Sequence, residues 1–171
     1  PGNALIDDWV RRRTGLSHDA DGALAAVGRV DAGVLAALAG NGWFALPPPK
    51  SLDRNAFDPA PAAGLSLEDG AATLAAFTAE SVALALRHVP VRPRRLLVCG
   101  GGRHNPTLMA MIAAHTGVAT QPVEAAGWNG DALEAEAFAY LGVRALRGLP
   151  ISFPQTTGVD VPLTGGVVTR P

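Results

Sequence analysis

Apolar residues recur at helical spacing in several stretches of the chain, and most of these stretches have recognisable start and stop signals. Helices are predicted over residues 3–13, 30–39, 66–88, 105–116 and 129–147. Asn3 and Ser66 are the expected N-caps of the first and third helices, and Asn129 or Asp131 is expected to cap the last.

Two short apolar runs between these helices predict strands. Residues 96–99 form a continuous apolar run of the kind found in buried strands, and residues 118–123 form a second one. Residues 44–64 are rich in proline and predict an extended connector, and the end "VPLTGGVV" at 161–168 is strand-like. The alternation of strands and helices predicts an α/β layered lobe.

Composition narrows the class of protein. The 171 residues fit one domain or one lobe, with 48% apolar and 17% charged residues and a net charge of −1. The arginine clusters at 11–13 and 92–95 carry no interleaved aromatics, so no nucleic-acid partner is expected. A single cysteine fits a reducing compartment. No membrane association is expected, because no stretch approaches about 18 apolar residues.

Three consecutive glycines, Gly100–Gly102, follow the first predicted strand and precede the helix that begins at Asn105. Glycine admits positive φ angles and lets a ligand approach the backbone without a Cβ in the way. A bare loop between a strand and a helix presents N–H groups to an anion or a nucleotide. The pattern is neither G-x-G-x-x-G nor a Walker A motif, so a plain strand-to-helix turn stays open beside a nucleotide loop.

Glu134 shares a predicted helix stripe with Phe138, Leu141 and Ala145. A carboxylate on an apolar stripe is costly to bury unless it is paired or faces a wet cleft. Two interpretations stay open: Glu134 stabilises the first turn through the helix dipole, or it is a cleft carboxylate that binds a hydroxyl-rich ligand. Glu136 is expected on another face, solvated and paired with basic neighbours.

The remaining candidates give weaker signals. Lys50 is the only lysine among fourteen basic residues, and it is either chemically required or simply solvated in the proline-rich connector. Cys99 ends a predicted buried strand and is expected to be a packing residue. No metal site is predicted from the histidines, which lack ligand spacing. They are His18, His88, His104 and His115.

Five stretches together resemble the anhydro-N-acetylmuramic acid kinases, in the order seen in that family. They are "PGNALIDDWVRRRTG" at 1–15, "FALPPPKS" at 44–51, "LLVCGGGRHNPTLM" at 96–109, "GDALEAEAFAYLGVRALRGLP" at 130–150 and "FPQTTGV" at 153–159. The combination is specific to the family, whereas any single piece is not. The resemblance covers nearly the whole chain and about the C-terminal half of such an enzyme.

The resemblance implies a ribonuclease-H-like lobe of the actin/sugar kinase/Hsp70 ATPase superfold, with residues 1–171 as the C-terminal nucleotide-binding lobe and the N-terminal lobe outside this chain. It implies ATP-dependent phosphorylation of 1,6-anhydro-N-acetylmuramic acid with hydrolytic ring opening to N-acetylmuramic acid 6-phosphate, in cell-wall recycling. ATP, Mg²⁺, a cytoplasmic location and a homodimer go with that expectation. The base aspartate is expected in the absent lobe, so this chain alone should not turn over.

Individual site residues follow from the same resemblance. Gly2 and Asn3 match the end of the second phosphate-binding turn. Gly100, Gly101 and Gly102 match the adenosine-side glycines, with Asn105 beginning the helix behind them. Glu134 matches the glutamate of the family's E-A-x-A-F-A helix, which implies contact with the sugar.

The chain departs from the family pattern in two places. Ile151-Ser152 stands where members often have Gly-Asn, and residues 155–158 replace Ser-Val-Thr-Gly. Lys50 lies in a matching P-P-K-S segment to which no role is assigned. Two alternatives remain: a kinase of the same superfold acting on another sugar, and a non-catalytic nucleotide-binding lobe.

Overall fold

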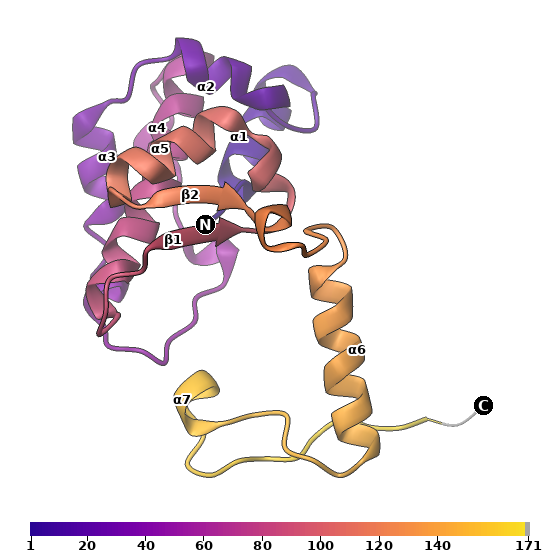
Figure 1. The fold of residues 1–171 in the computed structure, drawn as a ribbon. Helices are drawn as coiled ribbons and strands as arrows, with labels where there is room; N and C mark the ends of the chain where they lie inside the picture. The colour runs from indigo at the N-terminus through magenta and orange to yellow at the C-terminus, as the bar shows by residue number, and fades with distance from the viewer. Residues whose placement is uncertain (170–171) are drawn as a thin grey trace.

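The computed structural model describes residues 1–169. For Arg54 it describes the backbone alone. The body consists of helices with one pair of strands at one side, and short 3-10 turns join several of the helices (Figure 1). In chain order the elements are α1 (Ala4–Thr14), α2 (Ala23–Val27), α3 (Ala32–Ala39), α4 (Leu67–Ala85), β1 (Arg95–Val98), α5 (Pro106–Thr116), β2 (Ala119–Pro122), α6 (Leu133–Leu146) and α7 (Pro154–Thr157).

Helix α4 is the centre of the body, and α1, α2, α3 and α5 pack against it (Figure 1). Its residues from Gly70 to Ala79 are all buried, and Leu74 and Phe77 are among the largest side chains that are fully removed from solvent. A helix that is apolar all round belongs in a core. Most of its other buried positions are alanine, so the neighbouring helices lie close to its axis.

The two strands form a parallel pair with α5 as the crossover between them. The register places Arg95 opposite Ala119 and Val98 opposite Pro122. Leu96 and Val98 pack against the core, as the apolar run predicts. Cys99 is exposed, so its predicted packing role is wrong: the strand ends at Val98 and the chain turns away into the glycine loop. The helices and the parallel pair make this an α/β unit.

Two of the predicted helix starts are confirmed by side-chain caps. The Ser66 hydroxyl accepts a hydrogen bond from the Asp69 N–H at the start of α4, and Asn105 Oδ1 accepts one from the Leu108 N–H at the start of α5. Helix α3 begins two residues later than predicted, because the Asp31 carboxylate caps it.

Two other predicted caps are wrong. Asn3 has a helical backbone, and its side chain makes no capping hydrogen bond to α1. Neither Asn129 nor Asp131 caps α6, whose preceding residue is Ala132. The Asn129 side chain instead closes a turn by accepting hydrogen bonds from the N–H groups of Asp131 and Ala132. The carboxylate of Asp131 is paired with a distant arginine, described below.

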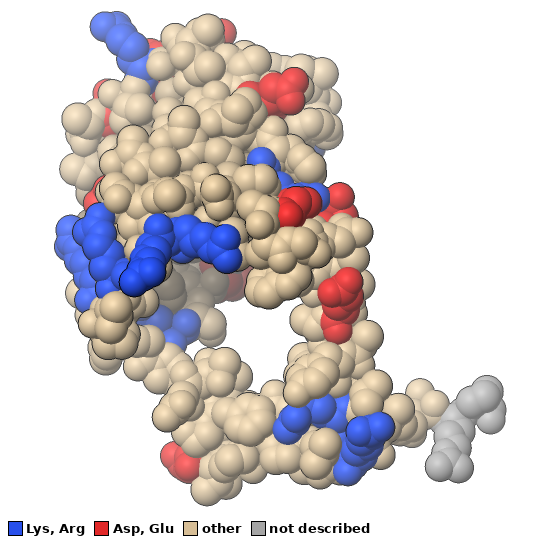
Figure 2. All heavy atoms as spheres, in the orientation of Figure 1, with Lys and Arg blue, Asp and Glu red and all other residues tan. Residues whose placement is uncertain are grey.

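Residues 133–169, the C-terminal arm, leave the body along α6 (Figure 1). No residue of α6 is buried. A hole separates α6 from the body (Figure 2), and the arm meets the body again just after α7, where a Cβ on Gly158 would lie 3.2 Å from Pro49. The strand-like end pairs only through one antiparallel bridge, between Ser152 and Leu163.

Among the described residues, no single helix is long and apolar enough to cross a membrane. One bent pair, Ala20–Val27 with Ala32–Ala39, has the length and composition, with an angle of 118° between its halves.

The contact between α1 and α4 depends on the absence of a side chain at Gly70. The indole of Trp9 lies where a Cβ on Gly70 would be, and its Nε1 donates to the Leu67 carbonyl at 2.9 Å. Gly70→Ala should therefore lower the free energy of unfolding by about 1–3 kcal/mol, the usual cost of overpacking. Urea denaturation followed by tryptophan fluorescence measures the loss.

Gly64→Ala is the matched control for that measurement. A Cβ at Gly64 meets nothing within 4 Å, so this variant should stay within about 1 kcal/mol of the parent. Equal stability of the two variants would contradict the packing argument.

Candidate functional site

The glycine loop lies at the carboxyl end of β1, where the chain turns into α5. Gly100 has φ +73°, a left-handed value that favours glycine. A Cβ on Gly100 or Gly101 would meet nothing within 4 Å, so the backbone there faces open space. Gly102 differs, because a Cβ on it would lie 3.3 Å from Leu108 and 3.6 Å from Asn3 Oδ1. The loop is thus packed on one side and bare on the other.

A polar pocket of about 370 Å³ opens beside this loop. It brings together the start of α1, the turn before α2, the glycine loop and the start of α5. Its lining residues are Asn3, Asp7, Ser17, His18, Asp19, Asp21, Gly101, His104 and Asn105. Three of the residues predicted to bind nucleotide, far apart in sequence, therefore share one cavity: Asn3, Gly101 and Asn105.

Unsatisfied polar groups are concentrated in this pocket. Among the described residues, the only buried side-chain polar atoms without a hydrogen-bond partner are Asn3 Oδ1, Asp7 Oδ1 and Asn105 Nδ2. The Asn105 residue is 4% exposed, and its Oδ1 is already used to cap α5, which assigns Nδ2 as the free donor. Each unpaired buried group costs about 1–3 kcal/mol. All three belong to residues that line the pocket, which makes this pocket the candidate binding site.

Asp7 is one of the lining residues that sequence reasoning missed. Burial raises the pKa of its carboxyl group, and the nearby charges of His18 and Arg11 oppose that rise. The available signal was spacing, because Asp7 follows Asn3 by four residues and so lies on the same side of α1. A carboxylate kept in a desolvated pocket is a common feature of functional sites.

The polar groups of the pocket can be compared with the needs of phosphate oxygens and of Mg²⁺, the groups that the resemblance leads us to expect. Bare loop N–H groups and the Asn105 amide suit phosphate oxygens. Among the described residues there is no cluster of three His, Cys, Asp or Glu side chains that could hold a metal by themselves. Mg²⁺ does not need one, since it binds through one or two carboxylates together with substrate phosphates and waters. Asp7 and Asn3 supply oxygens of the right kind.

The other predicted site residues lie outside the pocket. Gly2 has φ +63°, and its carbonyl accepts a hydrogen bond of 2.8 Å from Thr78 Oγ1, which anchors the start of α1 on α4. Gly100 and Gly102 flank the lining residue Gly101. Glu134 is exposed on the first turn of α6 and is not part of the pocket wall.

Lys50 has a structural role. Its ammonium group donates to the carbonyls of Trp43 and Phe44 at 2.9 and 2.8 Å and lies 4.4 Å from the centre of the Trp43 ring. These contacts fold the proline-rich connector back on itself. The solvated-lysine interpretation is therefore wrong, because the side chain is half-buried and paired.

Comparison with known proteins places the chain in a family. A family model described as "Anhydro-N-acetylmuramic acid kinase" matches residues 1–171. A protein of that name from Rhizorhabdus wittichii is 65% identical over 171 residues, which cover 100% of this chain and 47% of the relative. Those of Rhodospirillum rubrum and Acidiphilium cryptum are 61% and 57% identical, covering 97% and 100% of this chain and 44% and 48% of the relatives. The chain spans about half the length of these relatives.

The desolvation of Asp7 predicts a pH dependence of stability. Because its pKa is raised, the folded chain holds more protons than the unfolded chain between the ordinary value of 3.8 and the raised value. The free energy of unfolding therefore falls as the pH rises through that window. Asp7→Asn removes this titration, so the variant should lose that part of the decline and be more stable than the parent at neutral pH.

Urea unfolding followed by circular dichroism, from about pH 4 to about pH 7, tests this expectation. Asp8→Asn is the control, because Asp8 is next in sequence but pairs with Arg11 at the surface. An Asp7→Asn variant with the same pH profile as the parent would show that the carboxyl group does not pay a burial cost.

Proposed function

The chain belongs to the anhydro-N-acetylmuramic acid kinase family, and from that membership we propose that it is one lobe of an enzyme that transfers the γ-phosphoryl group of ATP to 1,6-anhydro-N-acetylmuramic acid. Water opens the anhydro ring in the same reaction, and the product is N-acetylmuramic acid 6-phosphate. The reaction belongs to the recycling of cell-wall sugars.

The observation that carries the proposal is the polar pocket at the glycine loop. In our proposal the bare backbone at Gly101 and the Asn105 amide would hold the ATP phosphates, with Nδ2 as a hydrogen-bond donor. Asp7 and Asn3 would hold the hydrated Mg²⁺ that accompanies the phosphates. The ion supplies neutralisation of phosphate charge, which is the main electrostatic requirement of phosphoryl transfer.

Glu134 belongs to the proposed sugar side of the site. The glycine loop follows β1, and α6 follows β2 through residues 123–132. Because the two strands are parallel, both segments leave the sheet at the same edge, where α/β proteins bind their ligands. The exposed carboxylate of Glu134 is free to accept hydrogen bonds from sugar hydroxyls.

The remaining part of the enzyme would complete the cleft. We propose that residues 1–171 form the C-terminal, ribonuclease-H-like lobe and that the aspartate that activates water lies in the other lobe. The exposed apolar side chains of the arm support a covering partner: Phe138 is 67% exposed, Tyr140 61% and Leu146 68%. A second copy of the chain is the alternative cover, which would make the enzyme a homodimer.

A kinase of the same superfold with a different sugar is the second candidate function. The exposed Cys99 is compatible with a reducing, cytoplasmic setting for either candidate.

The proposed function is tested with the full-length protein, ATP, Mg²⁺ and 1,6-anhydro-N-acetylmuramic acid. Mass spectrometry should show a product that has gained one phosphoryl group and one water. N-acetylmuramic acid and N-acetylglucosamine are the comparison substrates, and preferential phosphorylation of either one would favour the second candidate. A protein that binds ATP and phosphorylates none of the three would be a non-catalytic lobe.

Removing the charge of Glu134 should weaken the sugar side alone. Glu134→Gln in the full-length enzyme should lower kcat/KM for the anhydro sugar by at least about tenfold, or about 1.4 kcal/mol. Glu136→Gln, two residues along the same helix and also exposed, is the control and should retain the parent value. Steady-state kinetics at saturating ATP measure kcat/KM for the anhydro sugar in both variants. An unchanged kcat/KM in Glu134→Gln would show that Glu134 is not part of the sugar site.

A further inference from the structure

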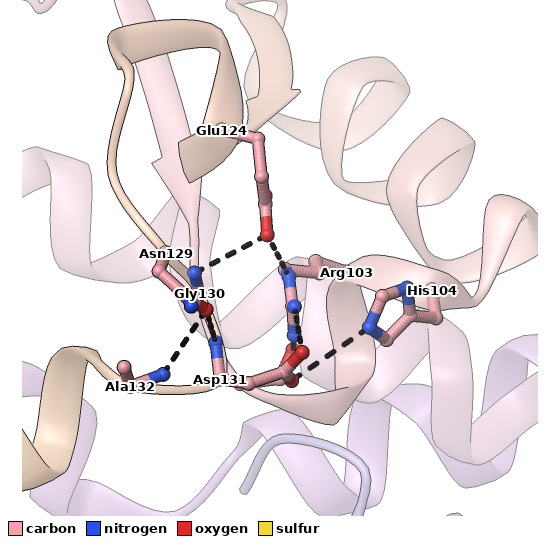
Figure 3. A network of polar contacts seen from close by, with 8 residues as sticks. Arg103, His104, Glu124, Asn129, Gly130, Asp131 and Ala132 are labelled. Carbon is pink, nitrogen blue, oxygen red and sulfur yellow. Dashed lines mark hydrogen bonds and ion pairs between the residues drawn. The ribbon is translucent and has the colours of Figure 1, made fainter.

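A buried arginine sits inside the glycine loop. The side chain of Arg103 is 2% exposed, and its guanidinium group binds in three directions (Figure 3). Nε donates to Glu124 Oε1, one terminal nitrogen donates to the Gly100 carbonyl, and the other pairs with Asp131 Oδ2, each at 2.9 Å. Two of these partners lie outside the loop, in the segment that leads from β2 into α6.

The leading segment, residues 123–132, is fitted closely around this guanidinium. Glu124 Oε1 also accepts a hydrogen bond of 3.2 Å from the Gly130 N–H. A Cβ added at Gly130 would overlap Arg103 Nε, so this glycine is needed for space rather than for a left-handed backbone. The Gly100 N–H also donates to the Gly130 carbonyl at 3.4 Å. The glycine loop and the leading segment are therefore held together as one unit.

The pKa values of the two acidic partners agree with this arrangement. The Arg103 hydrogen bond and charge hold the pKa of Asp131 below its usual value, with a smaller contribution from His104. The pKa of Glu124 is also lowered, first by its own backbone N–H and then by Arg103 and Gly130. Both acids are thus ionised partners of the arginine at neutral pH.

The direction of α6 depends on this unit. No residue of α6 is buried, so packing against the body does not orient the helix. The arm meets the body at the segment that precedes α6 and again at Gly158, which lies beside Pro49. Arg103 holds the first of these two places, which is the one next to Glu134. Glu134 lies three residues after Asp131, on the first turn of the helix.

We propose that Arg103 is a positioning residue that fixes the first turn of α6, and with it Glu134, relative to the glycine loop. The inference rests on the proposed function, because in it one side chain fixes the position of the sugar side of the site relative to the nucleotide side. Arginine suits the task, since the donors of its rigid planar guanidinium are spread over three nitrogens and reach acceptors that the single compact ammonium of lysine does not span.

Kinetics of the full-length enzyme test whether Arg103 acts through Glu134. Arg103→Lys keeps the charge and should raise KM for the anhydro sugar at least tenfold. In a Glu134→Gln background the same substitution should cost less than threefold more, because the group it positions is already gone. Of the Arg103 contacts, Asp131→Asn removes only the ion pair with the residue two positions before α6. It should raise KM for the sugar without changing KM for ATP.

Arg94→Lys is the matched control, because Arg94 is exposed near the same strand, and it should match the parent. Thermal unfolding of each variant separates positioning from folding: Asp131 is an exposed partner, so Asp131→Asn should keep the parent Tm. The proposal would be overturned if the fold increases in KM caused by Arg103→Lys and by Glu134→Gln multiply in the double variant. It would also be overturned if Arg103→Lys keeps the parent KM.

A distance measurement keeps the inference separate from the proposed function. One spin label on Cys99, which is exposed beside the loop, and another on a Glu136→Cys variant report the loop-to-α6 distance in the full-length protein, with any cysteine outside this chain replaced. Arg103→Lys should broaden the distance distribution, and Arg94→Lys should not. If Arg103→Lys leaves the distance distribution unchanged, the positioning role of Arg103 is overturned, even if the enzyme is active. If the parent enzyme is inactive but Arg103→Lys broadens the distribution, only the proposed function is overturned.

Discussion

The close packing of helices on α4 determines where everything else in the body lies. Gly70 admits the Trp9 ring and brings α1 against α4, and the Thr78 hydroxyl holds the Gly2 carbonyl at the start of α1. Helix α5 packs on α4 as well, and Thr107 on its first turn donates to the Gly22 carbonyl. Because α1 and α5 share this support, their N-terminal ends converge on the glycine loop, and the polar pocket forms between them.

That convergence has an energetic cost. Three buried polar atoms of pocket-lining residues lack partners, and Asp7 is desolvated enough that its pKa rises. A core optimised for stability alone would pair such groups or replace them. Their presence beside a loop with a bare backbone makes sense if a ligand supplies the missing hydrogen bonds. The stability cost and the binding capacity are then two consequences of the same residues.

Local sequence patterns predicted the features that are determined locally. Ser66 and Asn105 cap their helices because a cap needs only its own first turn. The α/β alternation and the placement of the three glycines between a strand and a helix are confirmed for the same reason. Asn3 and Asp131 look like equally good caps in sequence, yet Asp131 is taken by Arg103, 28 positions away, and Asn3 Oδ1 is left unpaired in the pocket. Only tertiary packing decides between these outcomes. Asp7 was missed because its spacing from Asn3 becomes a signal only once Asn3 is known to face a pocket.

The same distinction explains why Glu134 stays a prediction. Its position on α6 follows from the helical pattern, but the function of that position depends on groups beyond the helix. The body contributes one constraint through Arg103, which sets the direction in which α6 leaves the sheet edge. The exposed apolar side chains of α6 call for a second constraint, from a surface that covers them. A sugar site whose carboxylate is held from two sides in this way would form fully only when both surfaces are in place, which is consistent with a cleft between two lobes.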